Sequence, residues 1–281
     1  MKITSIIELL RIKQWYKNLA IFLAIFFIGP TTSTLIASIE TFIAFCLVSS
    51  TWYIFNDILD AKTDKIHPEK KKRPIASGEI SYLTACITVL ILILILPTLN
   101  LTENVIILLI ILGINNLIYN LWGRNIALID VHMIALNFLI RAVAGAEAIH
   151  VESSVWLVTT VFFTALLFAV SKRNAELMLL GKNAIKFKKV YLLYTKEILD
   201  MMRGVIAAIL LISYTLYVFF VHKQPIMIAT IPIASFIMFK YLYYTIINHK
   251  IARKIHHIFL DPHIILGLGT WCIIIIYGVY K

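Results

Sequence analysis

Residues 41–69 read TFIAFCLVSSTWYIFNDILDAKTDKIHPE, an apolar run that ends in a row of acids. Asp57, Asp60 and Asp64 stand at spacings i, i+3 and i+7, so one face of a continuing helix carries all three carboxylates. The cations Lys70 to Arg73 follow directly. Carboxylates at the water-filled end of a membrane bundle, with cations beside them, are typical of a site for a hard divalent metal and a phosphorylated molecule. The competing interpretation is a solvated helix end followed by a charged loop.

The composition of the chain predicts a membrane protein. The 281 residues are 60% hydrophobic and 15% charged, and the mean hydropathy is +0.89. Uncharged windows of about 19 residues or more recur, and each is long enough to cross a bilayer as a helix. We therefore expect an all-α, polytopic membrane protein that forms a single domain over residues 1–281. The nine predicted transmembrane helices are 17–36, 39–57, 80–98, 103–122, 126–149, 154–172, 202–221, 225–244 and 262–280.

The basic residues predict the orientation of this bundle. The inner connections carry nearly all of the Lys and Arg residues, whereas the outer side holds Lys223 and Lys281. Because cytoplasmic loops are the basic ones, we expect a cytoplasmic N-terminus in the cell (inner) membrane, with long polar loops at about 58–80 and 172–203 facing the cytoplasm. The net charge of +11 then reflects orientation and anionic lipid headgroups, so that no nucleic-acid partner is needed to explain it.

Four polar clusters fall on the cytoplasmic side of this topology, and we expect them to form one site that faces the cytoplasm. Asp130 and Arg141 lie within one predicted span, three helical turns apart, and can share an inward face. Ionisable groups inside a membrane are functional by default. The candidates for contacts to an anionic substrate in the four clusters are Gln14, Lys17 and Asn18; Lys72 and Arg73; Tyr119 and Arg124; and Lys172, Arg173, Glu176, Tyr191 and Tyr194.

These clusters, in this order, resemble the UbiA superfamily of intramembrane prenyltransferases, and the resemblance covers nearly the whole chain. Asn56-Asp57-x-x-Asp60-x-x-x-Asp64 is similar to the first Asp-rich motif of that superfamily. A closer similarity is to its decaprenyl-phosphate phosphoribosyltransferase branch. The segments that carry the closer similarity are Gln14-Trp15-x-Lys17-Asn18, His67-Pro68 to Arg73-Pro74-Ile75-Ala76-x-Gly78, Arg141-Ala142-x-Ala144-Gly145 and Lys172-Arg173-x-Ala175-Glu176.

The chain departs from both patterns in places. Members of the branch tend to show Tyr-Ser and Leu-Lys-His where this chain has Tyr119-Asn120 and Gly123-Arg124-Asn125. The aromatic-acid prenyltransferases of the superfamily carry a second Asp-x-x-x-Asp motif after the fourth span, and this sequence lacks it. The absence of this second motif argues against a reaction with an aromatic acceptor more than against phosphoribosyl transfer.

The resemblance implies a bilayer enzyme with phosphoribosyl pyrophosphate as donor, a polyprenyl phosphate as acceptor and Mg²⁺ as cofactor. Asp57, Asp60 and Asp64, with Asn56, are the expected metal ligands, some of them through water because Mg²⁺ retains several waters in proteins. The metal and the cations Lys17, Lys72, Arg73 and Lys172 or Arg173 would stabilise the departing pyrophosphate. Asp130 would stabilise the ribose cation or bind its hydroxyls. The remaining candidates named above would bind substrate.

Several alternatives stay open at the level of sequence. The same acids suit a prenyltransferase that moves a prenyl group from a prenyl diphosphate to an aromatic or other small acceptor. A transporter of an anionic lipid or of phosphate would use a similar basic chamber, although transporters place their sites near the midplane. Asp130 with Arg141, and Lys172 or Arg173 with Glu176, could be structural ion pairs, and the tyrosines could be interface aromatics. The oligomeric state is unknown.

Overall fold

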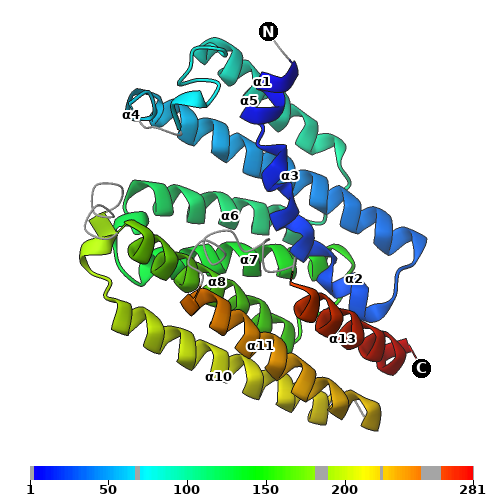
Figure 1. Cartoon of the computed structure of the whole chain (residues 1–281). Helices are drawn as coiled ribbons and strands as arrows, with labels where there is room; N and C mark the ends of the chain where they lie inside the picture. The colour runs from blue at the N-terminus through cyan, green and yellow to red at the C-terminus, as the bar shows by residue number, and fades with distance from the viewer. Residues whose placement is uncertain (1–2, 67–69, 181–188, 222–223, 248–260, 281) are drawn as a thin grey trace. The chain divides into compact units, whose positions relative to one another are not determined.

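The computed structural model of the chain describes residues 3–66, 70–180, 189–221, 224–247 and 261–280, and within these ranges it is helical without a strand (Figure 1). The chain divides into two compact units. Unit 1 comprises Met1–Asn120 with Ile140–Ser153, and unit 2 comprises Leu121–Leu139 with Ser154–Lys281. Helix α7 (Ile129–Ala148) contributes its first part to unit 2 and its second part to unit 1.

Unit 1 is organised around α3 (Thr32–Leu59), a helix of 28 residues. At 1.5 Å per residue this helix is about 42 Å long, more than a hydrocarbon layer requires. Its buried face packs with the α7 segment and α6 around Phe45, Leu112 and Ile140. The other elements of the unit are α1 (Ile3–Leu9), η1 (Ile12–Phe22), α2 (Leu23–Ile28), α4 (Ala61–Asp64), η2 (Lys70–Lys72), α5 (Tyr82–Ile95), η3 (Leu96–Thr98) and α6 (Glu103–Leu121).

Unit 2 is built on the pairing of α8 (Val155–Leu180) with α10 (Lys196–Phe220). Its core includes Leu167 of α8, Leu199 of α10 and Ile264 of α13 (Pro262–Tyr280). Thr195 caps α10, because its hydroxyl accepts a hydrogen bond from the Ile198 N–H. The other elements are η4 (Gly123–Asn125), η6 (Lys189–Leu192), η7 (Pro225–Ala229) and α11 (Thr230–Ile247), which packs against α13.

Within the described residues, six helical segments are long and apolar enough to cross a membrane. They are Thr32–Leu59, Glu103–Leu121, Ile129–Ala148, Val155–Leu179, Lys196–Phe220 and Pro225–Ile247. Two shorter apolar segments, Tyr82–Thr98 and Pro262–Gly278, accompany them. Many large side chains on these helices are exposed, for example Leu94, Ile110 and Leu266, as expected of surfaces that face lipid. The expected all-α, polytopic architecture is thus confirmed in outline, whereas nine crossings and a cytoplasmic N-terminus stay predictions.

The ends of two predicted helices are wrong. The first was expected to run to residue 36 and the second to start at residue 39, but α2 ends at Ile28 and α3 begins at Thr32. Gly29 adopts φ +86°, which a glycine tolerates, and Pro30 follows it. Thr31 then starts α3 with a capping box, in which its hydroxyl accepts from the Thr34 N–H and the Thr34 hydroxyl accepts from the Thr31 N–H.

The predicted polar loop at 172–203 is shorter than expected at both ends. Helix α8 continues to Leu180 and α10 begins at Lys196, so Lys172, Arg173 and Glu176 lie on the last turns of a helix. The structure describes residues 189–195 of the connection, which include η6. The polar residues at the end of α8 are consequently held by a regular backbone.

Gly145 on α7 lies directly against the backbone of η1. A Cβ atom built at this position would collide with the backbone carbonyl of Ile21, which is fully buried in η1. We predict that Gly145→Ala lowers the free energy of unfolding by about 1–3 kcal/mol, because neither backbone can give way cheaply. Denaturant unfolding of the purified protein in detergent measures this change.

Gly204 on α10 is the matched control for this substitution. Nothing lies within 4 Å of a Cβ built there, and alanine is the better helix former. Gly204→Ala should therefore leave the stability unchanged or raise it slightly. Equal stability of the two variants would show that α7 and η1 do not approach each other in this way.

Candidate active site

The last turn of α3 and the short helix α4 bring two carboxylates together. Asp57 and Asp64, called the acid pair from here on, are each 2% exposed. One nitrogen of Arg73, Nη1, donates to Asp57 Oδ1 at 3.1 Å and to Asp64 Oδ2 at 2.6 Å. Since both oxygens contact the same nitrogen atom, a single small cation in its place would meet both. The sequence predicted the proximity of these two acids and of Arg73 correctly.

A second arginine, which the sequence analysis missed, also contacts the acid pair. Arg11 Nη2 donates to Asp57 Oδ1, and the guanidinium lies 4.9 Å from the centroid of the Tyr53 ring. Lys70 Nζ lies 3.8 Å from Asp64 Oδ1. Three cations therefore surround two carboxylates. Arg11 lies three residues before Gln14, so its place beside that basic cluster was the available signal.

Asp60 lies at the junction of two helices, where the sequence predicts one continuing helix. Helix α3 ends at Leu59, and Asp60 joins it to α4 with φ −88° and ψ 0°. The hydrogen bonds from the Asp60 N–H to the Asn56 carbonyl and from the Asp64 N–H to the Asp60 carbonyl continue the helical pattern across this junction. Among the residues that the structure describes, no three His, Cys, Asp or Glu side chains are grouped to hold one ion. The expected set of three acids is thus reduced to the acid pair, beside half-buried Asn56 and Asp60.

The donor set of the acid pair fits a hard divalent cation. Carboxylate oxygens are the ligands that Mg²⁺ takes, usually one or two with waters and phosphate oxygens completing the shell. The contacts of 2.6 and 3.1 Å to Arg73 are longer than Mg–O bonds of about 2.1 Å. The two carboxylates would consequently have to close in on a metal, and Arg73 would have to leave the space between them.

Asn18 and Arg141 form a second polar group in unit 1. Arg141 Nε donates to Asn18 Oδ1 at 2.6 Å, and its Nη2 donates to Ser49 Oγ at 3.2 Å. Asn18 Nδ2 in turn donates to Cys46 Sγ at 3.1 Å. Asn18 is 1% and Arg141 is 7% exposed. These bonds join η1 and α7 to α3, so both residues hold together the helices that carry the acid pair.

Unit 2 contains a separate buried network centred on Asp130. Arg173 Nε donates to Asp130 Oδ2 at 2.7 Å, and the Tyr194 hydroxyl donates to Asp130 Oδ1 at 2.6 Å. The Tyr194 oxygen also accepts from the Leu128 N–H at 2.8 Å. Asp130 is fully buried and Arg173 is 2% exposed. The network ties the start of α7 to α8 and to the segment after η6. Asp130 accordingly pairs with Arg173 in the structure.

Tyr191 and Glu176 extend this network. The Tyr191 hydroxyl donates to Glu176 Oε2, which also accepts from Arg173 Nη1 at 3.1 Å. Burial raises the pKa of Tyr191, and burial together with the bond to Asp130 raises the pKa of Tyr194. Both phenols therefore remain protonated donors across the physiological range. Four residues that the sequence predicts to contact substrate thus form hydrogen bonds within one network around Asp130. They are Arg173, Glu176, Tyr191 and Tyr194.

Another polar group in unit 2 was missed by the sequence analysis. Asn174 Nδ2 donates to Asp200 Oδ1 at 2.8 Å, and Arg203 donates to the same oxygen. Arg203 Nη1 also donates to Thr245 Oγ1 at 2.6 Å, which joins α10 to α11. No motif marks these residues, because they lie on three different helices.

The other candidates are placed as follows. Lys72 and Lys172 are exposed. Gln14, Lys17, Tyr119 and Arg124 are half-buried. Gln14 and Lys17 share unit 1 with the acid pair, as do Lys72 and Tyr119, whereas Arg124 and Lys172 belong to unit 2. That the clusters of the two units form one site stays a prediction.

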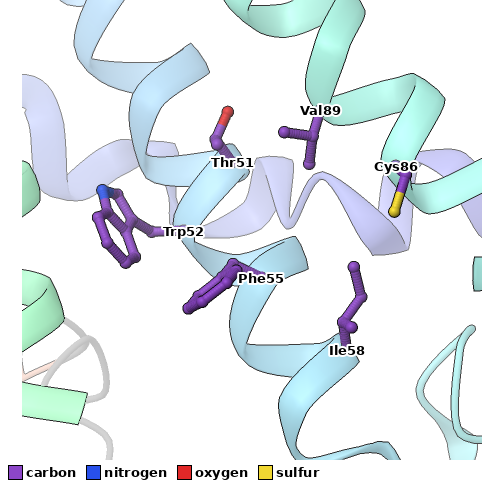
Figure 2. Close-up of a pocket in the computed structure, with 6 residues that line it drawn as sticks. All are labelled: Thr51, Trp52, Phe55, Ile58, Cys86 and Val89. Atoms are coloured by element: carbon purple, nitrogen blue, oxygen red, sulfur yellow. The ribbon is translucent and has the colours of Figure 1, made fainter. Parts of the chain in front are cut away.

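An apolar cavity of about 260 Å³ lies between α3 and α5 (Figure 2). Its lining comprises Thr51, Trp52, Phe55 and Ile58 from α3 and Cys86 and Val89 from α5. Ile58 directly follows Asp57 in the chain, so the cavity adjoins the helical turn that carries the acid pair. Apart from the apolar character of the two helices, nothing in the sequence predicts this cavity.

Comparison with known proteins first defines the class of fold. A solved UbiA homolog from Archaeoglobus fulgidus bound to DMAPP and Mg²⁺ superposes with a TM-score of 0.68 over 95% of this chain and 98% of that one, at 19% identity. The model of the UbiA prenyltransferase family matches residues 18–260. The chain therefore belongs to the UbiA prenyltransferase family, and it is an integral membrane transferase.

Two curated relatives are more similar in sequence. The decaprenyl-phosphate phosphoribosyltransferase of Mycolicibacterium smegmatis is 29% identical over 225 residues, which cover 77% of this chain and 71% of the relative. The enzyme of the same name from Corynebacterium glutamicum is 30% identical over 223 residues, or 76% of this chain and 67% of the relative. The resemblance inferred from the sequence is confirmed, both for the superfamily and for the branch.

The Asp130 network generates a test that separates support of the fold from contact with substrate. We predict that Asp130→Ala lowers the free energy of unfolding by about 3–5 kcal/mol, because the buried Arg173 then keeps only one of its two carboxylate partners, Glu176. Tyr194→Phe should cost less, about 1–3 kcal/mol, since it removes one donor. Denaturant unfolding in detergent measures both values.

Glu152→Ala, at an exposed acid before α8, is the control and should change stability by less than about 0.5 kcal/mol. A stable but inactive Asp130→Ala variant would contradict the structural role and would favour a direct contact of Asp130 with the ribose.

Proposed function

We propose that this chain transfers the 5-phosphoribosyl group of phosphoribosyl pyrophosphate to a polyprenyl phosphate of the decaprenyl type and releases pyrophosphate. The observation that carries the proposal is the match, over most of the chain, to two enzymes named for this acceptor and this group. The acid pair with its arginines supports it independently, because a metal and cations beside the hydrocarbon boundary suit a departing diphosphate.

The bond changes of this reaction balance without a general base. The bond from ribose C1 to the pyrophosphate oxygen breaks, and its electron pair leaves with pyrophosphate. An oxygen of the lipid phosphate then forms the new bond to C1. Because that phosphate is already an anion, no proton has to be removed. The residues of the enzyme consequently have to stabilise charge and align the two substrates.

Asp57 and Asp64 would hold Mg²⁺, and Asn56 and Asp60 would reach it through water. When bound, Mg²⁺ would neutralise the negative charge that develops on the departing pyrophosphate. Arg73 and Lys70 contact the acid pair and would stand beside the same leaving group. Lys72 and Lys172 are exposed cations that could meet the donor phosphates. We further propose that the site faces the cytoplasm, where phosphoribosyl pyrophosphate is available, in line with the basic residues around it.

The apolar cavity between α3 and α5 is the proposed place for the part of the lipid tail next to its phosphate (Figure 2). Apolar side chains line it, and it adjoins the turn of α3 that carries Asp57. A polyprenyl tail needs apolar surroundings, whereas its phosphate needs cations, and this end of α3 offers both within one helical turn.

We predict that Asp57→Asn reduces turnover about 100- to 1000-fold, the usual loss when one group that stabilises transition-state charge is removed. The amide oxygen of the new side chain can still accept from Arg11 and Arg73, so the fold should be preserved. Pyrophosphate release from phosphoribosyl pyrophosphate, in the presence of a polyprenyl phosphate, measures the rate.

Glu103→Gln serves as the control, because this exposed acid starts α6 and should not affect turnover. Turnover of the Asp57→Asn variant at the wild-type rate would remove the acid pair from the mechanism. Consumption of a prenyl diphosphate in place of phosphoribosyl pyrophosphate would instead favour prenyl transfer.

Cys86 offers a direct test of the tail site, because it is an exposed thiol in the lining of the cavity. A saturating polyprenyl phosphate should slow the alkylation of Cys86 by a maleimide, whereas inorganic phosphate should give no protection. Peptide mass spectrometry follows each thiol separately, and Cys272 on α13 should react at an unchanged rate. Equal protection of both thiols, or of neither, would refute the tail site.

A further inference from the structure

Arg11 contacts the acid pair, but the proposed reaction assigns it no role of its own. Its backbone adopts φ 49° and ψ 45°, the left-handed region that non-glycine residues rarely enter. This residue stands between α1 and η1, where the Arg11 N–H donates to the Glu8 carbonyl and the Gln14 N–H donates to the Arg11 carbonyl. Unusual backbone conformations of this kind concentrate at functional sites. The observed result of this turn is that the guanidinium reaches Asp57.

The arginines already balance the charge of the acid pair. Two carboxylates, Asp57 and Asp64, face two guanidinium groups, Arg11 and Arg73, and both arginines contact the same oxygen, Asp57 Oδ1. A divalent cation that approached this oxygen would meet two positive charges at contact distance. The repulsion is substantial in a partly buried site, where charges are weakly screened. The acid pair is therefore poorly prepared for a metal that arrives alone.

A diphosphate that arrives with the metal would change this electrostatic balance, because its negative charges attract both arginines. It carries several negative charges and binds arginine in the two-pronged fashion that carboxylates also use. The side chains of Arg11 and Arg73 are each 25% exposed, so both have access to an incoming ligand, whereas the acid pair is enclosed. Within the described part of the chain, the polar partner of the Arg11 side chain is Asp57, and its other contact is the Tyr53 ring. Arg11 can consequently leave Asp57 without breaking other hydrogen bonds of its side chain.

We propose that Arg11 and Arg73 are exchangeable partners: they neutralise the acid pair in the substrate-free enzyme and move to the diphosphate when it enters with its metal. Arg11 is then a substrate-binding residue for the leaving group, and it makes the affinity for the metal depend on the diphosphate. The proposal rests on the proposed function only in that the substrate brings a diphosphate and a divalent metal. Since coupling between two ligands is reciprocal, each should bind more tightly in the presence of the other.

The test measures binding rather than turnover, on the purified full-length protein in detergent. Mn²⁺ alone and Mn²⁺ with inorganic pyrophosphate are the probes, followed by the electron paramagnetic resonance signal of free Mn²⁺ and by calorimetry. Arg11→Gln should tighten the binding of Mn²⁺ alone by about tenfold, because one competing cation is gone. The same variant should weaken the binding of the Mn²⁺–pyrophosphate complex by about 10- to 100-fold, because one charged contact is lost.

Lys13→Gln is the matched control. This lysine is exposed and lies two residues from Arg11, so its removal changes the net charge equally but should alter neither affinity. Arg11→Lys keeps the charge and should return both affinities most of the way to wild type. This variant also keeps the proposal testable if Arg11→Gln does not fold, because it should then show the same two shifts with smaller size.

Shifts of opposite sign support the exchange, and a merely structural Arg11 cannot produce them. Weaker binding of both probes, or no change in either, would overturn the proposal. Pyrophosphate is the product of phosphoribosyl transfer and of prenyl transfer alike, so the result does not depend on the group transferred. The two proposals can also fail separately. If Arg11→Gln shows the two predicted shifts but the wild-type protein does not consume phosphoribosyl pyrophosphate, the proposed function is refuted and the exchange still holds.

Discussion

Two carboxylates buried at the end of a membrane-crossing helix must have cations beside them, and much of unit 1 follows from this constraint. An isolated charge removed from water costs several kcal/mol, so Asp57 and Asp64 depend on Arg11 and Arg73. These two arginines come from opposite sides of Asp57 in the sequence. Arg11 comes from the N-terminal side, at a left-handed turn between α1 and η1, and Arg73 comes from the C-terminal side, directly after η2.

The buried polar groups of the two units serve different purposes. In unit 2, the oxygens of Asp130 and Glu176 accept from Arg173, Tyr191 and Tyr194, and the result is a closed network that fixes η6 and α8. Networks satisfied in this way add rigidity. The acid pair differs because its partners are arginines that remain partly open to water. The proposed exchange uses this difference, because partly exposed arginines would turn from the carboxylates to an incoming anion.

The sequence predicted the helices and the closeness of Asp57 and Asp64 better than it predicted the ends of the helices and the contacts between them. Apolar length located the spans, and Gly29-Pro30 with Thr31 accounts for the helix ends that length alone misplaced. Periodicity also put Asp57 and Asp64 on one face, and they do converge. Within the described residues, however, no three acids form one group that could hold an ion. The contact of Arg11 with Asp57 was missed, because a left-handed arginine has no sequence signature. Asn174, Asp200 and Arg203 were missed since tertiary packing brought them together.

The acid pair itself has no means of distinguishing one diphosphate donor from another. In the proposed reaction, the metal, Arg11 and Arg73 would all interact with phosphate oxygens, which phosphoribosyl pyrophosphate and a prenyl diphosphate share. Selection between the two donors must therefore come from groups that meet the rest of the substrate, a ribose phosphate in one case and a hydrocarbon in the other. The polar candidates outside the acid pair suit the ribose phosphate, and the apolar cavity beside α3 suits a lipid tail. A family that keeps one leaving-group site can accordingly change its reaction by altering these surroundings alone.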